Sequence, residues 1–257
     1  MVGFKCLIDL ILKHAEHAIV SLNSPENRIS PDEMLWFTHT NPYVTWLHSR
    51  SSTLWYRSLP QPCDDYHDNV AAAVSTNMAA KYRSFAQFSQ KRKEIENSRV
   101  LYVRCTSADT ILLSSHKTLD GNVVTPAAIM RSLICQALLL DCAEVEDLHS
   151  RTLLLLPAQE DILRRGLELD QPIVLSKLLE LFGETLNIIN SPDAVALDHV
   201  ESIDSTAGNG FLDALRTLLE SGVPKVKFII SGVPNPALES ALRGVESIDD
   251  NTEYNGM

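Results

Sequence analysis

The chain has 257 residues, 45% of them hydrophobic, which is enough for one large or two small domains with a sizeable core. Its formal net charge of −11 argues against a general nucleic-acid-binding surface, which needs clustered Lys and Arg side chains. Five cysteines without a C-x-x-C pair predict neither a disulfide framework nor a zinc knuckle, so we expect buried thiols in a reducing cytoplasm.

Residues 4–20 carry apolar side chains at roughly helical spacing, interrupted by Lys5, Asp9 and Lys13. A secretory signal would not contain Asp9 in its apolar core, and the run is too short to span a bilayer. We expect an amphipathic helix that packs on its own domain, with a partner-binding or membrane-surface helix as the alternative. Together with a polar linker it forms an N-terminal unit over residues 1–30.

Residues 31–244 alternate short apolar runs with helical patterns. This alternation predicts an α/β fold, a doubly wound, mainly parallel sheet flanked by helices. We expect strands near residues 53–56, 99–105, 194–197 and 225–230. We expect helices near residues 66–88, 126–139, 153–157 together with 161–169, 173–187 and 209–221. Residues 245–257 are polar and predict a frayed tail.

The third predicted strand ends at Asp198, at the edge of the sheet where α/β folds place their ligands and where P-loop enzymes keep a magnesium carboxylate. After it come acidic residues, an amphipathic helix, and a strand that leads to Ser231 and Pro234. Trp36 and Trp46 precede the first strand, and the Leu54-Trp55 pair begins it. Together with these residues, this order resembles the NACHT-type NTPase domain of STAND proteins, the fungal NOD-like receptors. The resemblance covers roughly residues 32–242 and implies a P-loop NTPase-like fold.

The family's phosphate loop reads roughly G-x-P-G-x-G-K-S, whereas residues 58–65 of this chain read SLPQPCDD. The loop glycines are absent, and Pro62 removes a backbone N–H donor. Asp64 and Asp65 stand in place of Lys and Ser. Like charges about 4 Å apart cost on the order of 4 kcal/mol at an effective dielectric constant of about 20, so phosphate should be rejected. The family's acidic box has Ser202 in place of an acid, and Gly232 occupies the place of its arginine.

The resemblance therefore implies a degenerate Walker motif in a pseudoenzyme, with no catalytic residue, cofactor or metal. Its vestigial nucleotide site comprises Ser58, Pro60, Asp64, Asp65, Asp198 and Ser231. The implied function is that of a non-catalytic, cytoplasmic NACHT-like module with a protein-interaction or regulatory role. Two alternatives stay open: an atypical signalling NTPase that binds ATP or GTP, and a shortened family remnant without activity.

The implied partner is another protein, either a full-length NACHT receptor or a second copy of this chain, with no nucleic acid and no membrane span. The resemblance ends after the sensor-strand region, before the family's lid domains, so faces that a lid would cover are expected to be bare. The candidate docking surfaces are residues 4–20, the helix over residues 211–219, and the segment around Leu238 and Leu242, unless these side chains pack internally.

Overall fold

The structure of the protein is a computed structural model. It describes residues 8, 11–12, 40–48, 53–57, 100–105, 125–140, 142, 145–155, 157–167, 175–189, 192, 194–203, 205–221 and 226–249. The expected helix over residues 66–88, the linker that ends the N-terminal unit, and Trp36 lie outside these residues.

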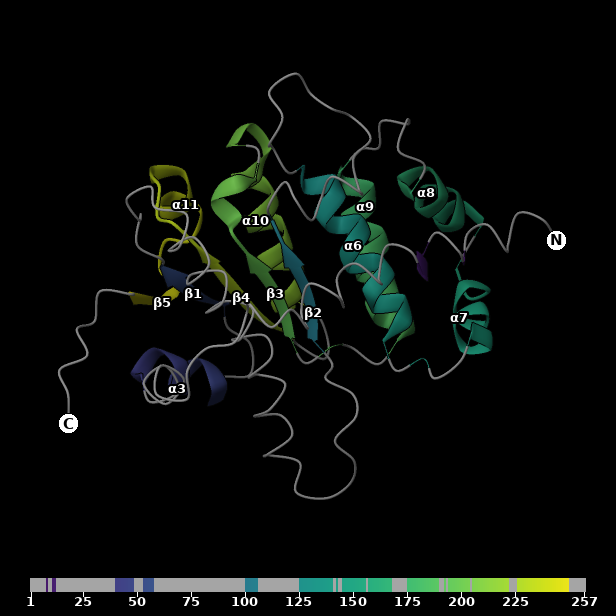
Figure 1. The fold of residues 1–257 in the computed structure, drawn as a ribbon, viewed down its shortest axis with the longest axis horizontal. Helices are drawn as coiled ribbons and strands as arrows, with labels where there is room; N and C mark the ends of the chain where they lie inside the picture. The colour runs from purple at the N-terminus through teal and green to yellow at the C-terminus, as the bar shows by residue number, and fades with distance from the viewer. Residues whose placement is uncertain are drawn as a thin grey trace, which may run out of the picture.

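Five strands form one sheet in the order β2-β3-β4-β1-β5 (Figure 1). Every neighbouring pair is parallel. The strands are β1 (Thr53–Arg57), β2 (Val100–Arg104), β3 (Ala194–Asp198), β4 (Lys227–Gly232) and β5 (Glu246–Asp249). The α/β class and the parallel sheet are thus confirmed, and the four expected strands lie within two residues of the predicted bounds. Parallel strands are buried on both faces, which is why they could be recognised as apolar runs.

One face of the sheet packs against the main core. It contributes alternate strand residues to a large apolar cluster, among them Trp55, Leu101, Val103, Val195, Phe228 and Ile230. Helices α6 (Pro126–Leu139), α9 (Leu175–Ile188) and α10 (Ser205–Ser221) supply the opposing side chains. The short helix α11 (Pro236–Ala241) packs beside α10. Two further helices, α7 (Val145–Thr152) and α8 (Pro157–Leu167), pack against α6 from outside this layer (Figure 1).

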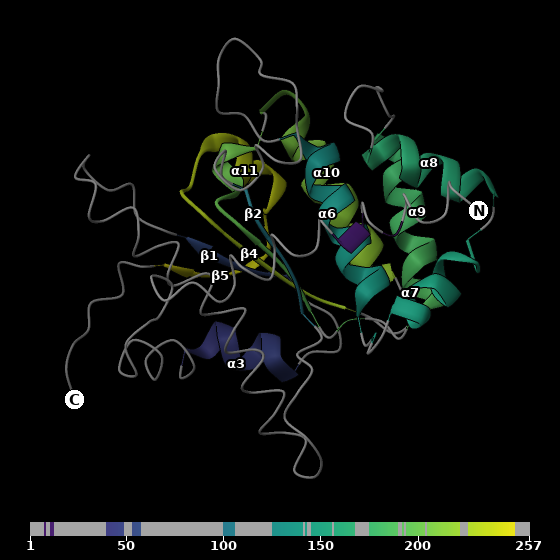
Figure 2. The ribbon, with the colours of Figure 1, turned by 45° about the vertical axis from the view of Figure 1, so that its right-hand side comes forward.

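The intervening strand residues, including Leu54, Tyr56, Ala196 and Ile229, are buried without belonging to that cluster, because side chains alternate between the two faces of a strand. Helix α3 (Asn41–His48) packs on β1 and β5, and Figures 1 and 2 show it on the opposite side of the sheet from α10 and α11. The sheet therefore has helices on both faces.

Helix α6 begins where its sequence predicts. The Thr125 side chain accepts a hydrogen bond from the Ala128 N–H at 3.3 Å, and Pro126 occupies the first turn, where no N–H donor is needed. Its last carbonyls, those of Leu138 and Leu140, accept hydrogen bonds from the Arg151 guanidinium of α7. Most of the helix is buried, and each of its ends has backbone groups that are capped by a side chain.

Helix α3 is fixed to the sheet by Lys227, the first residue of β4. The Lys227 Nζ donates to the carbonyl oxygen of Trp46 and lies 5.2 Å from the centroid of the Trp46 ring. A cation there meets the last turn of α3, where the helix dipole is negative. Burial nevertheless lowers the pKa of Lys227 from 10.5 to about 8.

The docking surfaces predicted on α10 and around Leu238 and Leu242 are wrong, whereas Leu12 within residues 4–20 is 36% exposed. In α10, Phe211, Leu212, Leu215 and Leu219 are buried, because this helix covers β4 and contacts α9 and α11. Leu238 and Leu242 are buried as well, and so are Ile8 and Ile11 of the N-terminal helix. These side chains pack inside the protein, as the alternative expectation stated.

The predicted polar tail also needs correction at its start. Residues Glu246 to Asp249 form β5, which pairs with β1, and Ile248 is buried. Residues 250–257 lie outside the described part of the chain. Within the residues that the structure describes, no helix has both the length and the apolar character required to cross a membrane.

Candidate functional site

The candidate site is the edge of the sheet at which the strands end. Because all five strands are parallel, their carboxyl ends meet at this edge, where ligands bind in open α/β sheets. Strand β4 lies between β1 and β3, so Arg57 and Asp198 end strands that are roughly 10 Å apart. The two positions from which the resemblance builds a nucleotide site, the exit of β1 and the end of β3, thus share one edge.

Two of the six predicted site residues fall on this edge within the described chain. Asp198 is the last residue of β3, opposite Arg104 of β2, and only its backbone is described. Ser231 lies in β4 opposite Tyr56 of β1 and is 1% exposed. The other four residues, Ser58, Pro60, Asp64 and Asp65, lie outside the described residues.

A carboxylate joins the ends of β3 and β4. Glu201 lies in the short helix η2 (Val200–Ser202), directly after β3. Its Oε2 accepts a hydrogen bond from the Val233 N–H at 3.1 Å, and its Oε1 lies 3.1 Å from the His199 Nδ1. His199 has a φ of 57°, in the left-handed region, which turns the chain sharply out of β3. Both oxygens of Glu201 are therefore engaged within the protein.

Gly232 makes this contact possible. A Cβ at position 232 would lie 2.4 Å from the Glu201 Oε2 and 2.9 Å from the Val200 Cγ2. Neither distance is compatible with a side chain, so β4 approaches η2 closely only because residue 232 is glycine. The family's arginine could not stand here unless Glu201 left its place.

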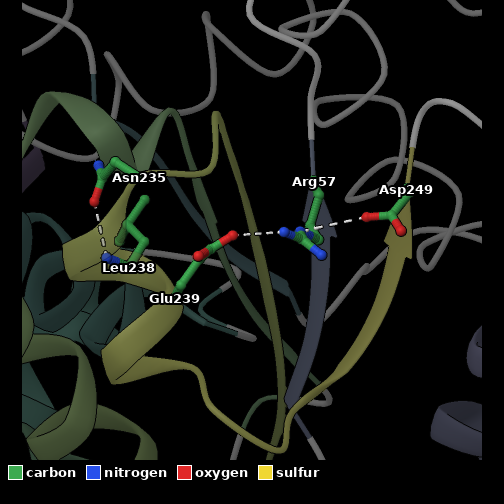
Figure 3. Close-up of polar contacts among 5 residues, drawn as sticks. All are labelled: Arg57, Asn235, Leu238, Glu239 and Asp249. Atoms are coloured by element: carbon green, nitrogen blue, oxygen red, sulfur yellow. Dashed lines mark hydrogen bonds and ion pairs between the residues drawn. The ribbon is translucent and has the colours of Figure 1, made fainter.

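A second group of charges surrounds the end of β1; we call it the Arg57 cluster, consisting of Trp55, Arg57, Glu239 and Asp249. The Arg57 Nη2 lies 2.7 Å from the Glu239 Oε1, and its Nε lies 3.3 Å from the Asp249 Oδ1 (Figure 3). The guanidinium carbon lies 4.9 Å from the Trp55 ring centroid, a cation–π contact. The cluster joins three elements: β1, α11 and β5.

The start of α11 sets the position of Glu239. The Asn235 side chain accepts a hydrogen bond from the Leu238 N–H at 2.8 Å, and Pro236 follows as the first helical residue (Figure 3). Glu239 then projects from the first turn toward Arg57. The Asn235-Pro236 pair is recognisable in the sequence as a helix start, but nothing in the sequence pairs Glu239 with a residue 182 positions earlier.

The described part of the site offers little reactive chemistry. Among the described residues, no group of three His, Cys, Asp or Glu side chains could hold a metal ion. Cys105 is buried, and burial raises the pKa of Cys135 to about 12, which favours the protonated thiol at neutral pH. Lys227, whose pKa is lowered, begins β4 and thus lies at the opposite edge of the sheet.

Comparisons with protein-family models, with curated proteins and with solved structures gave no match.

Proposed function

We propose that the protein is a non-catalytic α/β module, related in fold to the NACHT-type P-loop NTPases, that works by binding another protein. The observation that carries this proposal is the closure of the ligand edge by contacts within the chain. Arg57 is engaged by two carboxylates, and both oxygens of Glu201 are engaged by His199 and Val233.

The strand order supports the fold relationship. It brings the exit of β1 and the end of β3 to one edge with only β4 between them, as a phosphate loop and a magnesium carboxylate would require. A sheet with helices on both faces is the doubly wound arrangement that the resemblance implies.

The charges at this edge support the lack of catalysis. Glu239 and Asp249 pair with Arg57, the only arginine or lysine at the strand ends whose side chain is described, and Glu201 adds a carboxylate after the end of β3. The sequence adds Asp64 and Asp65 where the family has Lys and Ser. A nucleoside triphosphate would meet mostly negative charge at this edge and would have to compete with Glu239 and Asp249 for Arg57.

Calorimetric titration with ATP and GTP in the presence of magnesium tests the proposal. We expect dissociation constants no tighter than about millimolar, the weak end of the affinity scale, and no phosphate release. A micromolar constant would instead establish the atypical NTPase.

A restored loop tests the fold relationship separately. The variant carries Ser58→Gly, Gln61→Gly, Cys63→Gly, Asp64→Lys and Asp65→Ser. We expect it to gain nucleotide affinity over the unaltered protein, because backbone N–H groups and a cation would again face the phosphates. If the variant folds and gains nothing, the NACHT relationship loses its support.

The proposed partner is a full-length NACHT receptor or a second copy of this chain. Light scattering at tens of micromolar tests for a second copy of this chain, and co-purification from the native cytosol tests for a receptor. Both experiments use the protein with and without residues 1–24. A protein that stays monomeric and captures no receptor would point to the remnant alternative.

A further inference from the structure

We propose that Arg57 is an oxyanion-binding group. In this protein the carboxylates of Glu239 and Asp249 occupy the position that an external anion would take. The inference rests on the proposed function, in which no external nucleotide occupies this edge. The external ligand class that the same group would take is a small oxyanion, with phosphate or a carboxylate as the two sources.

The guanidinium is set up for such a ligand. Arginine presents planar N–H donors that match carboxylate and phosphate oxygens, and stacking on an aromatic ring fixes the plane of the fork. Here Trp55, two residues earlier on the same face of β1, provides that ring at 4.9 Å. Arg57 thus stays oriented whichever anion faces it.

The two carboxylates use only part of the hydrogen-bonding capacity of the Arg57 guanidinium. Glu239 bonds to Nη2 at 2.7 Å, but the Asp249 contact at 3.3 Å lacks hydrogen-bond geometry. The Nε of Arg57 is buried and has no hydrogen-bond acceptor within the described part of the protein. One N–H of the fork is therefore available to an anion that replaces Asp249.

The two carboxylates can also leave without disturbing the core. The Glu239 and Asp249 side chains are 53% and 54% exposed, whereas Arg57 is 29% exposed and rests on Trp55. Exposed ion pairs contribute little, so each carboxylate reduces the affinity for an outside anion by a factor of up to about five. Because they come from separate elements, α11 and β5, each can be removed alone.

Inorganic phosphate is the probe, and its affinity is measured by NMR titration of the Arg57 Nε–H signal and by calorimetry. We expect Glu239→Gln/Asp249→Asn to bind phosphate about four- to twenty-five-fold more tightly than the unaltered protein, the product of two gains of about two- to fivefold. Adding Arg57→Met should remove this gain. A matched control, Glu146→Gln/Glu180→Gln, makes the same charge change on exposed faces of α7 and α9 and should stay within about twofold of the unaltered protein.

A gain below threefold in the double variant, a gain that survives Arg57→Met, or an equal gain in the control would overturn the inference. If the double variant does not fold, Glu239→Gln and Asp249→Asn decide singly, each with an expected gain of about two- to fivefold. Acetate in place of phosphate separates the two ligand sources. These results concern the variants only, whereas micromolar ATP binding by the unaltered protein would count against the proposed function itself.

Discussion

Replacement of Gly232 by alanine is the most direct test of the way in which the sheet edge is closed. The added Cβ would lie 2.4 Å from the Glu201 Oε2, 2.9 Å from the Val200 Cγ2 and 3.2 Å from the Val200 backbone N. The backbone atom cannot yield cheaply. Glu201 is the group that can move, and moving it breaks its hydrogen bond to the Val233 N–H and its contact with His199.

The expected loss of stability depends on how the protein responds to the added Cβ: it can tolerate the overpacking, or it can displace Glu201. Overpacking without relaxation costs about 1–3 kcal/mol, and loss of a hydrogen bond to a charged group costs about 1.5–3 kcal/mol. Since the protein adopts the cheaper of the two responses, we expect Gly232→Ala to lower the free energy of unfolding by about 1–3 kcal/mol.

Urea unfolding at neutral pH measures this loss, and a double-mutant cycle assigns its cause. In a Glu201→Ala background the atom at 2.4 Å is gone, so Gly232→Ala should cost at least about 1 kcal/mol less than it does alone. The matched control is Gly210→Ala in α10, where an added Cβ meets nothing within 4 Å. It should stabilise the protein by up to about 1 kcal/mol, because alanine is the better helix former. A cost below about 0.5 kcal/mol for Gly232→Ala, or additive effects of the two substitutions, would refute the steric reasoning.

Two further predictions concern α3 and α6. Burial lowers the pKa of Lys227 to about 8 in the folded protein, whereas the unfolded chain keeps the ordinary value of 10.5. Between these values the unfolded state binds more protons, so the free energy of unfolding should rise from pH 8 to pH 10.5, and Lys227→Met should reduce this rise in urea titrations across that range. Thr125→Ala removes the N-cap of α6 and should cost about 1 kcal/mol in urea unfolding, whereas Thr125→Ser should be nearly neutral. Equal losses for both Thr125 substitutions would show that the hydroxyl cap is not the cause.

The central strands and the larger helices could be predicted because their signals are local. Strands β3 and β4 are buried on both faces, so they are continuous apolar runs, and α6 begins with the Thr125-Pro126 pair. Strand β5 and helix α7 have no such signal. In β5 only Ile248 is buried, and β5 exists because β1 offers it a paired edge. In α7 the apolar residue Leu148 is buried among mostly exposed polar neighbours.

The docking surfaces were predicted wrongly for a related reason. An amphipathic pattern shows that a helix has an apolar face, but it does not show what covers that face. For Phe211, Leu215 and Leu219 the cover is the sheet itself together with neighbouring helices. The Arg57 cluster was missed because its members come from three elements that are far apart in the chain. No spacing rule connects them, and only the packed sheet brings them together.

Gly232 shows most clearly what a family comparison omits. When the sequence is compared with the resembling family, Gly232 is interpreted only as the loss of the family's arginine. In the folded protein it has a positive role, because its missing side chain leaves room for Glu201 to bridge β3 and β4. At the end of β1, Arg57 similarly bridges α11 and β5. The two bridges tie the strand ends together through contacts within the chain: Glu201 with His199 and Val233, and Arg57 with Glu239 and Asp249. At Gly232, the residue that differs from the resembling family's pattern is thus part of a contact on which this sheet edge depends.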